Sequence, residues 1–400
     1  RQYVLDVEPD VEPETVYDSL LIFHVRSASS PSSVEKPYAD LPNRLRLSSI
    51  VSTAPLPTRQ NLVPALGPRT LITIVIEYAN AQNEASTTSL ASAFEQGTRN
   101  IKGLFDVSSY GSTTFSNYNA VRASMPADAP TAASNGECDF ILMAEQAKNH
   151  LQSSGVNPLA YTHQEYILPA SFPSCSLAFS GIAYLGYRSN CGSYCISWVR
   201  NTNALVRAHE IGHNLGLGHA SQSFSEYRDF SSPMSNSGNW KLFAIAERYE
   251  IGWLTSSNAP LHDSVNTALF TLHDRGIHPI NAAGQIAAVR VECPLCLYPA
   301  GGGTLFISYA SGANDAYDAD LTAEYSGNVL IKALGTYPFD AGTAGTYMYS
   351  KLGAGTSYAL SNAGITVFAC STSSSSAVVA IGPLGSASLC DPSPSPPPPS

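Results

Sequence analysis

The residues best suited to chemistry lie in one run of eleven, from His209 to His219. The run reads H-E-x-x-H-x-x-G-x-x-H. On a helix, His209 and His213 are four residues apart, so both imidazoles project from one face and can hold a zinc ion. Glu210 is adjacent to the first candidate ligand and can act as a general base on a metal-bound water. The run therefore predicts a metal centre with a base beside it.

The glycine in this run indicates how a third ligand is reached. Gly216 follows His213 by three residues, and glycine can take the positive φ that ends a helix and turns the chain. Such a turn would bring His219 to the metal. Three protein ligands leave one position open, as in catalytic rather than structural zinc sites. The alternative is a buried helix whose histidines only make hydrogen bonds.

This run matches the metzincin signature, and Met234 follows in a segment, S-S-P-M-S, that resembles the metzincin Met-turn. In that family the methionine forms a hydrophobic floor under the zinc. Over about residues 70–390, and most strongly over 205–255, the chain resembles gametolysin and related matrix metalloproteases of volvocine green algae. The resemblance implies a secreted zinc endopeptidase that acts on glycoproteins of the extracellular matrix or cell wall, rich in hydroxyproline and proline.

Two positions differ from relatives within the metzincins. Several gametolysin-like proteins carry Gln at the first ligand position, where this chain has His209. Astacin-like and serralysin-like proteins place Tyr two residues after the turn methionine, where this chain has Asn236. The sequence therefore predicts three histidine ligands and no tyrosine switch at the zinc.

The elements around the run predict two structural domains. We expect an α+β metzincin-like catalytic domain over residues 70–255, with a twisted mixed sheet, the zinc helix and the Met-turn. An all-β, sandwich-like domain is expected over 256–390, because strand-like runs recur there between turn residues. Residues 1–69 are expected to be an N-terminal flank or a retained pro-segment. Residues 391–400 form a proline- and serine-rich tail.

Individual elements follow from apolar periodicity. Helices are predicted over 89–104 and from Phe140, the zinc helix begins at Thr202 or Asn203, and a last helix occupies 240–254. Strands are predicted at 71–76, from Thr113, at 165–168, 181–186, 269–272, 287–291, 304–309, 328–333, 346–350, 365–369 and 377–381.

The strand at 181–186 precedes the zinc helix, where metzincins have the antiparallel edge that pairs with an extended substrate. An unpaired strand edge can accept a peptide as an additional strand. The alternative is an ordinary sheet edge closed by a loop. The candidate substrate residues are Ile182, Ala183, Tyr184 and Leu185.

The composition of the chain excludes some classes of binding partner. The net charge of −10 argues against nucleic acid and anionic membrane surfaces, which need cationic patches. No apolar run approaches the 18 residues of a transmembrane helix. Asp315, Asp318 and Asp320 lack the glycine and terminal glutamate of an EF-hand, so they do not predict a calcium site. The expected cofactor is Zn²⁺ alone, and the expected partner is a protein or glycoprotein substrate.

The cysteines indicate an oxidising compartment. Their number, eight, is even and they are spread through a long chain, which suits disulfides in a secreted protein. Local pairs are predicted between Cys191 and Cys195 and between Cys370 and Cys390. Another close pair, C-P-L-C at 293–296, could be half a zinc knuckle or a redox pair, but it has no matching second pair and no thioredoxin-like context.

The tail and the motif lead to three function hypotheses. The tail must adopt polyproline II and resembles the hydroxyproline-rich stalks of algal matrix proteins, which implies contact with matrix; a simple linker is the alternative. The favoured function is a zinc metalloendopeptidase. A latent or non-catalytic matrix protein on a metzincin scaffold, and a zinc hydrolase of non-peptide bonds, are the alternatives. Glu210 favours the enzyme, because a purely structural zinc needs no base.

Overall fold

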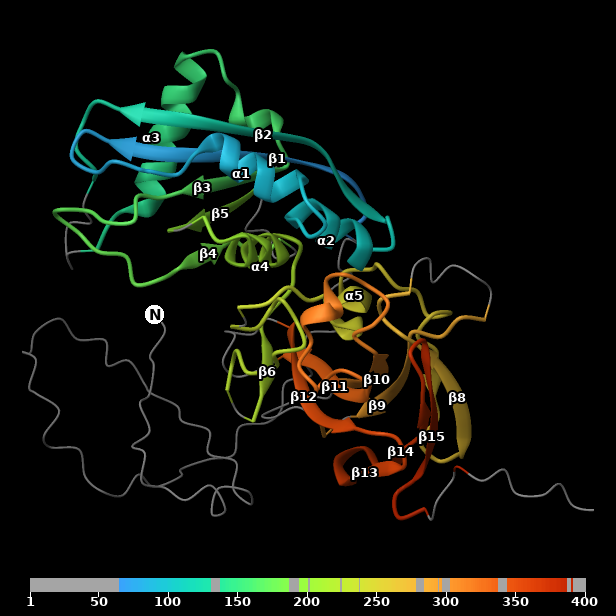
Figure 1. Cartoon of the computed structure of the whole chain (residues 1–400). Helices are drawn as coiled ribbons and strands as arrows, with labels where there is room; N and C mark the ends of the chain where they lie inside the picture. Colours follow the sequence, from blue (N-terminus) through green and yellow to red (C-terminus); the bar gives the residue numbers. More distant parts are fainter. Residues whose placement is uncertain are drawn as a thin grey trace, which may run out of the picture. The chain divides into compact units, whose positions relative to one another are not determined.

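The computed structural model describes residues 65–130, 137–186, 194–200, 202–223, 225–236, 238–277, 284–293, 295–296, 303–336, 344–386 and 390, all within one compact unit that spans 57–400. These residues form a mixed α/β structure with three sheets and few helices (Figure 1). The predicted tail, the predicted partner Cys191 and nearly all of the predicted N-terminal flank (residues 1–69) lie outside the described residues. The division of the chain at residue 255 is not tested by the structure. All of these stay predictions.

The first sheet has five strands in the order β2-β1-β3-β5-β4. Its middle strands are parallel and covered on both faces, which explains the continuous β-branched run in β1. Within this sheet β4 alone is antiparallel, and it lies at the edge beside β5. The strands are β1 (Gly67–Tyr78), β2 (Thr113–Met125), β3 (His163–Ile167), β4 (Gly181–Ala183) and β5 (Cys195–Val199). Strand β5 was not predicted from the sequence.

The described helices are short. They are α1 (Thr87–Glu95), α2 (Ile101–Ser108), α3 (Phe140–Ser153), α4 (Ala204–Asn214) and α5 (Ile245–Glu250), together with the 3₁₀ turns η3 (Pro158–Ala160), η4 (Asp318–Asp320) and η5 (Ser361–Ala363). In Figure 1, α1 and α2 run along the same sheet that α3 flanks.

Two predicted helices were wrong in extent. The helix expected over 89–104 is divided into α1 and α2, because Gly97 has a φ of 84° and the side chain of Asn100 caps α2 by accepting from the Gly103 N–H at 2.7 Å. The helix expected over 240–254 contains only α5. The preceding N–H groups are used elsewhere: Leu242 donates to Asp318 Oδ1 at 3.0 Å and Ala244 to Glu247 Oε2 at 2.7 Å.

The remaining strands form a six-stranded sheet, in the order β6-β12-β11-β10-β9-β7, and a four-stranded sheet, β13-β14-β15-β8. Both sheets contribute alternate residues to one hydrophobic core, which includes Val291, Ile307, Ile331, Val367 and Val379. Strand β6 follows the histidine run directly and pairs with β12 in parallel. The bounds are β6 (Ala220–Gln222), β7 (Leu261–His262), β8 (Ala268–His273), β9 (Ala288–Cys293), β10 (Gly303–Ala310), β11 (Asn328–Thr336), β12 (Ala344–Leu352), β13 (Thr356–Leu360), β14 (Ile365–Thr372) and β15 (Ser376–Pro383).

Three disulfides are present among the described residues. The predicted pair Cys370–Cys390 is bonded. Cys138 is bonded to Cys175, which the sequence did not predict. The C-P-L-C pair is also a disulfide. Cys195 is disulfide-bonded, and its pairing with Cys191 stays a prediction because Cys191 lies outside the described residues.

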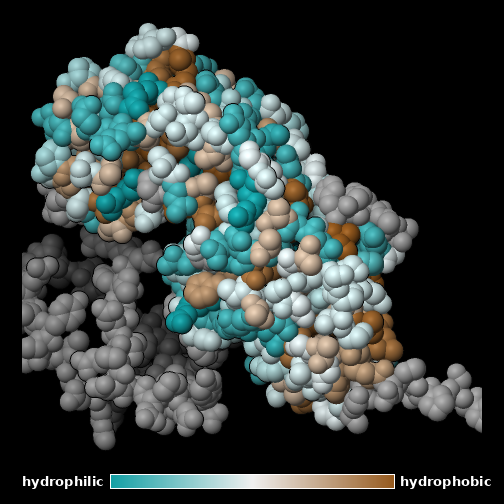
Figure 2. Space-filling view, viewed as in Figure 1, coloured by the Kyte–Doolittle hydropathy of each residue, from teal (hydrophilic) through white to brown (hydrophobic). Residues whose placement is uncertain are grey.

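The surface carries few large apolar groups. The face shown in Figure 2 is mostly hydrophilic or weakly polar, with apolar residues at the top of the view and at the lower right, near β8. Leu269 in β8 and Leu261 in β7 are about half exposed, and Val265 between them is 70% exposed. Among the described helices, none has the length and apolar character needed to cross a membrane.

Candidate metal centre

Helix α4 presents the first part of the histidine run. Its N-cap is Asn203, one of the two predicted caps, whose side chain accepts from the Leu205 N–H at 2.9 Å. The helix ends after Asn214, and Gly216 has the predicted positive φ, 105°. The chain then turns back and enters β6, so His219 faces the helix.

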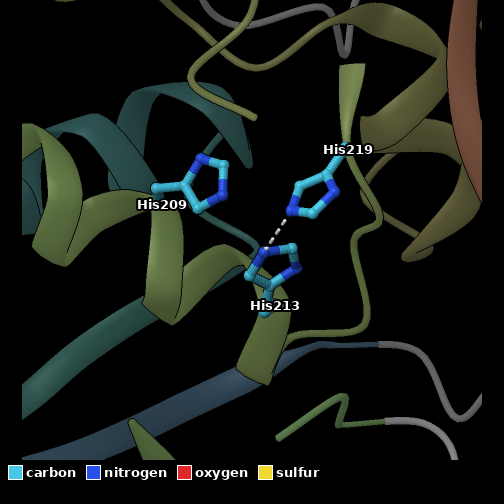
Figure 3. Close-up of side chains that lie close together, drawn as sticks. All are labelled: His209, His213 and His219. Carbon is cyan, nitrogen blue, oxygen red and sulfur yellow. Dashed lines mark hydrogen bonds between the residues drawn. The ribbon is translucent and has the colours of Figure 1, made fainter. Parts of the chain in front are cut away.

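The three predicted ligands converge (Figure 3). One ring nitrogen from each of His209, His213 and His219 lies within 4.8 Å of the others. The Nε2 atoms of His213 and His219 are 3.0 Å apart. The structure therefore brings together three imidazoles from two segments, with His209 and His213 on one face of α4 and His219 after the turn.

The outer nitrogen of each ring has a defined partner. His209 Nδ1 lies 2.9 Å from the Pro233 carbonyl oxygen, and His213 Nδ1 lies 2.7 Å from the Leu217 carbonyl oxygen. His219 Nδ1 lies 2.6 Å from Glu226 Oε1. Since these partners are acceptors, each Nδ1 carries the hydrogen. Partners of this kind orient histidine ligands and make them more basic.

This tautomer assignment tests whether the site fits a metal ion. With hydrogen on Nδ1, the Nε2 atoms of neutral His213 and His219 are both acceptors, yet they lie 3.0 Å apart. Two acceptors at that distance repel each other unless a cation lies between them. Tetrahedral zinc with Zn–N bonds of about 2.0–2.1 Å needs nitrogens roughly 3.3 Å apart. The donor set fits such an ion.

Glu210 lies on α4 in a closely packed position. Its residue is 4% exposed, and Oε2 has no hydrogen-bond partner among the described residues. Burial raises the pKa of this carboxyl to about 8, because a low-polarity environment disfavours the charged form. A positive charge on His219 would act in the opposite direction. A bound divalent cation would further favour the carboxylate.

The closeness of β4 explains the burial of Glu210. A Cβ atom added to Gly181 would lie 2.3 Å from Glu210 Oε1 and 2.7 Å from its Cδ. Only glycine leaves room for this carboxylate between α4 and the edge strand. Gly181 was not predicted as a site residue, and its place one residue before the candidate edge residues was the available signal.

The predicted edge residues differ in how far their side chains are exposed. Ile182 is 39% exposed, whereas Tyr184 packs its ring against Trp198, with centroids 5.2 Å apart. The amide of Asn214 at the end of α4 donates to the Tyr184 and Ile196 carbonyl oxygens, at 2.8 and 3.0 Å. The edge of the first sheet is therefore tied to the histidine helix. The strand predicted over 181–186 was too long: β4 ends at Ala183, and Tyr184 and Leu185 lie in the loop that follows it.

Met234 lies directly against α4. It is fully buried, and a Cβ atom added to Gly212 would lie 2.6 Å from its Sδ. We call residues 229–235 the Met234 turn. Besides the methionine, this turn supplies the Pro233 carbonyl that accepts from His209.

Two residues at the site escaped the sequence analysis. Glu226 holds the ring of His219, as described above. The ring of Tyr227 lies 4.2 Å from that of His219, centroid to centroid, and Tyr227 is 37% exposed. The position two residues after Met234 holds the exposed Asn236, whereas Tyr227 reaches the site from the loop before the turn and was not predicted from the sequence. The only sequence signal for Glu226 and Tyr227 was their closeness to His219 in the chain.

A helix-borne histidine pair, a third histidine and a buried carboxylate on a mixed α/β fold are the arrangement found in metal-dependent hydrolases. The family model for gametolysin peptidase M11 matches residues 73–363, most of the chain, so the chain belongs to the gametolysin family of metallopeptidases. A search of curated proteins found no match.

Among solved structures, "Structure of a chaperone-substrate complex" matches with 11% sequence identity and a TM-score of 0.26. The match covers 45% of this chain and 29% of that chain, and it is too weak to bear on the fold.

Proposed function

We propose that the protein is a secreted zinc endopeptidase of the metzincin type that cleaves glycoproteins of an extracellular matrix or cell wall. The observation that carries this proposal is the convergence of three imidazoles whose outer nitrogens are all engaged by acceptors. Family membership already implies a metallopeptidase and hence a protein substrate. Zinc, the metzincin class and the substrate type belong to the proposal.

Each residue of the proposed metal centre has a separate role. His209, His213 and His219 would hold the ion. Bound zinc would supply Lewis acidity, which polarises a carbonyl and lowers the pKa of a water molecule. Glu210 Oε2 would accept the proton of the attacking water and deliver it to the leaving amine nitrogen. Met234 would form the apolar floor below the histidines.

The edge of the first sheet supports a peptide substrate. Strand β4 is antiparallel to β5 and terminal in its sheet, so an extended peptide can add beside it through main-chain hydrogen bonds. The side chain of Ile182 is exposed there. We propose that residues 182–185 guide the substrate past Glu210.

Secretion and the rest of the architecture complete the proposal. Three disulfides among the described residues suit an oxidising compartment. The two sheets that share one core after α5 suit the expected sandwich. A preference for hydroxyproline- and proline-rich substrates, and a matrix contact through the tail at 391–400, rest on family resemblance alone.

Replacing the proposed base tests the function. We expect Glu210→Ala to keep its zinc and to lose cleavage by about 10²–10⁴-fold, the usual contribution of a general base. Cleavage of casein and of a hydroxyproline-rich glycoprotein would be measured beside zinc content. The matched control is Glu145→Ala, on the exposed face of α3, which should cleave like the unmodified chain.

The alternative is a latent or non-catalytic matrix protein. Zinc bound to a wild-type chain that cleaves neither substrate would favour it, and removal of residues 1–64, which leaves Ala65 and strand β1 intact, would then separate latency from inactivity. Full cleavage by Glu210→Ala would contradict the assigned base.

A further inference from the structure

The third histidine is held by the six-stranded sheet. Residues 220–222, directly after His219, form β6, whose partner is β12. The N–H of Thr346 in β12 donates to the His219 carbonyl oxygen at 3.1 Å. The main chain of this candidate ligand is therefore fixed by a strand that lies more than one hundred residues later in the chain.

The same β region holds the Met234 turn through two buried cations. Lys332 of β11 is 2% exposed; its Nζ forms an ion pair with Asp229 Oδ2 at 2.6 Å and donates to Ser231 Oγ at 2.8 Å. Arg275, just after β8, is 1% exposed and donates from Nη1 to the Ser231 carbonyl oxygen at 2.8 Å. Both contacts converge on Ser231.

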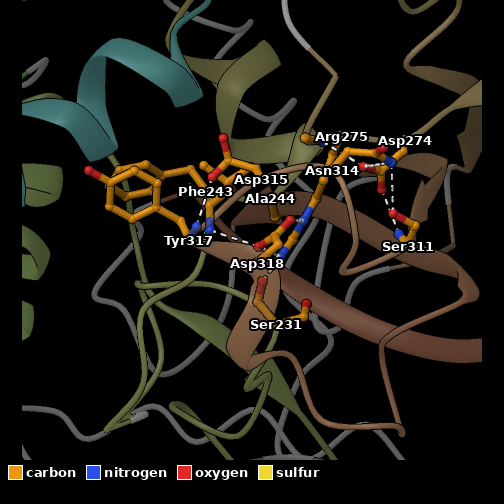
Figure 4. A network of polar contacts seen from close by, with 12 residues as sticks. Ser231, Phe243, Ala244, Asp274, Arg275, Ser311, Asn314, Asp315, Tyr317 and Asp318 are labelled. Atoms are coloured by element: carbon orange, nitrogen blue, oxygen red, sulfur yellow. Dashed lines mark hydrogen bonds and ion pairs between the residues drawn. The ribbon is translucent and has the colours of Figure 1, made fainter. Parts of the chain in front are cut away.

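Arg275 is itself rigidly placed (Figure 4). Its Nε and Nη2 donate to the two oxygens of Asp318, each at 2.6 Å, and Asp318 is 1% exposed. Asp318 also accepts from the Leu242 N–H. Because Asp318 binds both Nε and Nη2, the planar guanidinium of Arg275 has a fixed orientation. Its Nη1 group therefore meets the Ser231 carbonyl in a fixed direction.

A short covalent path leads from Ser231 to the metal site. Ser232 Oγ accepts from the Met234 N–H at 3.0 Å and donates to the Glu247 carboxylate at 2.7 Å. The next residue, Pro233, supplies the carbonyl that lies 2.9 Å from His209 Nδ1. Any shift of Ser231 therefore moves both the acceptor of His209 and the methionine under α4.

We propose that Lys332 and Arg275 are positioning residues of the metal centre, which act through the Met234 turn on His209. The inference rests on the proposed function. According to this inference, the β region after α5 helps to position the residues of the metal centre. Buried charges in a sheet are costly in free energy unless they are paired. The use of two buried cations at this contact therefore indicates that they fix the geometry of the turn rather than add stability.

The test removes both charges of one ion pair. The double variant Lys332→Met with Asp229→Asn loses the ion pair, and the amide oxygen introduced at position 229 can still accept from the Ser231 N–H that Asp229 Oδ1 now binds at 3.1 Å. The matched control is Lys351→Met with Glu324→Gln, a lysine–carboxylate pair whose lysine lies on the neighbouring strand β12 and which makes no direct contact with the turn. Zinc affinity, the visible spectrum of the Co²⁺ form, kcat, KM and Tm would be measured.

We expect the first double variant to bind zinc about tenfold more weakly, in the range found for outer partners of metal ligands. Its Co²⁺ spectrum should shift and kcat should fall more than KM rises, while the control pair leaves all three unchanged. Ser231→Ala, which removes one hydroxyl only, should shift the spectrum in the same direction. It gives a second test if the double variant does not fold.

Unchanged zinc affinity and Co²⁺ spectra in both the double variant and Ser231→Ala, with only Tm altered, would overturn the inference and leave the network a stabilising one. A wild-type chain that binds no metal would instead overturn the proposed function. The two failures are thus distinguishable.

Discussion

The two segments that build the metal centre are anchored by different means. Helix α4, with His209 and His213, is held by Arg207, which lies in the same helix and pairs at 2.8 Å with Glu165 of β3, both fully buried. The segment with His219 and Met234 is held by Lys332 and Arg275, which lie far away in sequence. Arg207 lies in the same helix as His209 and His213, whereas Lys332 and Arg275 lie in the β region that follows α5 in sequence.

This difference shows what a short motif specifies. The spacing of the histidines defines which atoms can meet, but both halves need a buried cation to fix their place. The distant anchors make the β region after α5 part of the site's support. Substitutions on either side can separate these contributions.

The largest effect is expected from Arg207→Met. The change leaves the Glu165 carboxylate buried without its partner, so the free energy of unfolding should fall by about 3–5 kcal/mol. Denaturant unfolding would measure it. Arg122→Met, which breaks a partly exposed pair with Glu77, should cost less than about 1 kcal/mol; similar losses in both variants would show that burial of the Arg207 pair does not matter.

A smaller effect, on catalysis, is expected from Gly181→Ala. The added Cβ would meet the Glu210 carboxylate, and a displacement of the order of 1 Å can lower a rate about 100-fold. Steady-state kinetics should show a fall in kcat of that size with zinc content unchanged. Gly353→Ala, where the nearest atom to a new Cβ is 3.4 Å away, serves as the control. Unaltered kcat in Gly181→Ala would argue against a role for this close contact.

The smallest effect concerns acid stability of the first sheet. Burial, with a further contribution from Arg69, lowers the pKa of His163 in β3 to about 3. Unfolded histidine has a pKa near 6.5, so between these values the unfolded state binds the additional proton and stability falls as the pH falls. Between about pH 6 and pH 5 the loss should be about 1 kcal/mol.

His163→Gln should remove this part of the pH dependence. Unfolding free energies of the two proteins, measured at both pH values, give the comparison. Equal slopes would mean that His163 binds protons equally in the folded and unfolded states.

Much of the local structure could be predicted. The histidine run, the cap at Asn203, the positive φ of Gly216 and the Cys370–Cys390 disulfide follow from short-range patterns, and the structure contains each of them. The family suggested by resemblance is confirmed by the family match. These features depend on residues close together in sequence.

The errors came from tertiary contacts. The helix predicted over 240–254 was too long because side chains such as Asp318 take its N–H groups. Lys332 gave a weak signal, as a charge within the apolar strand V-L-I-K-A-L, since a buried lysine requires a partner. Its partner Asp229 could not be found from spacing, because the two are brought together only by the sheet.

The most direct measurement is the zinc content and cleavage activity of the purified chain, beside His219→Ala and His150→Ala. We predict a single zinc ion per wild-type chain, whose removal by a chelator abolishes cleavage and whose return restores it. His219→Ala should lose both metal and cleavage, and His150→Ala, on α3, should lose neither. Cleavage without metal, or undiminished zinc in His219→Ala, would contradict the proposed metal centre.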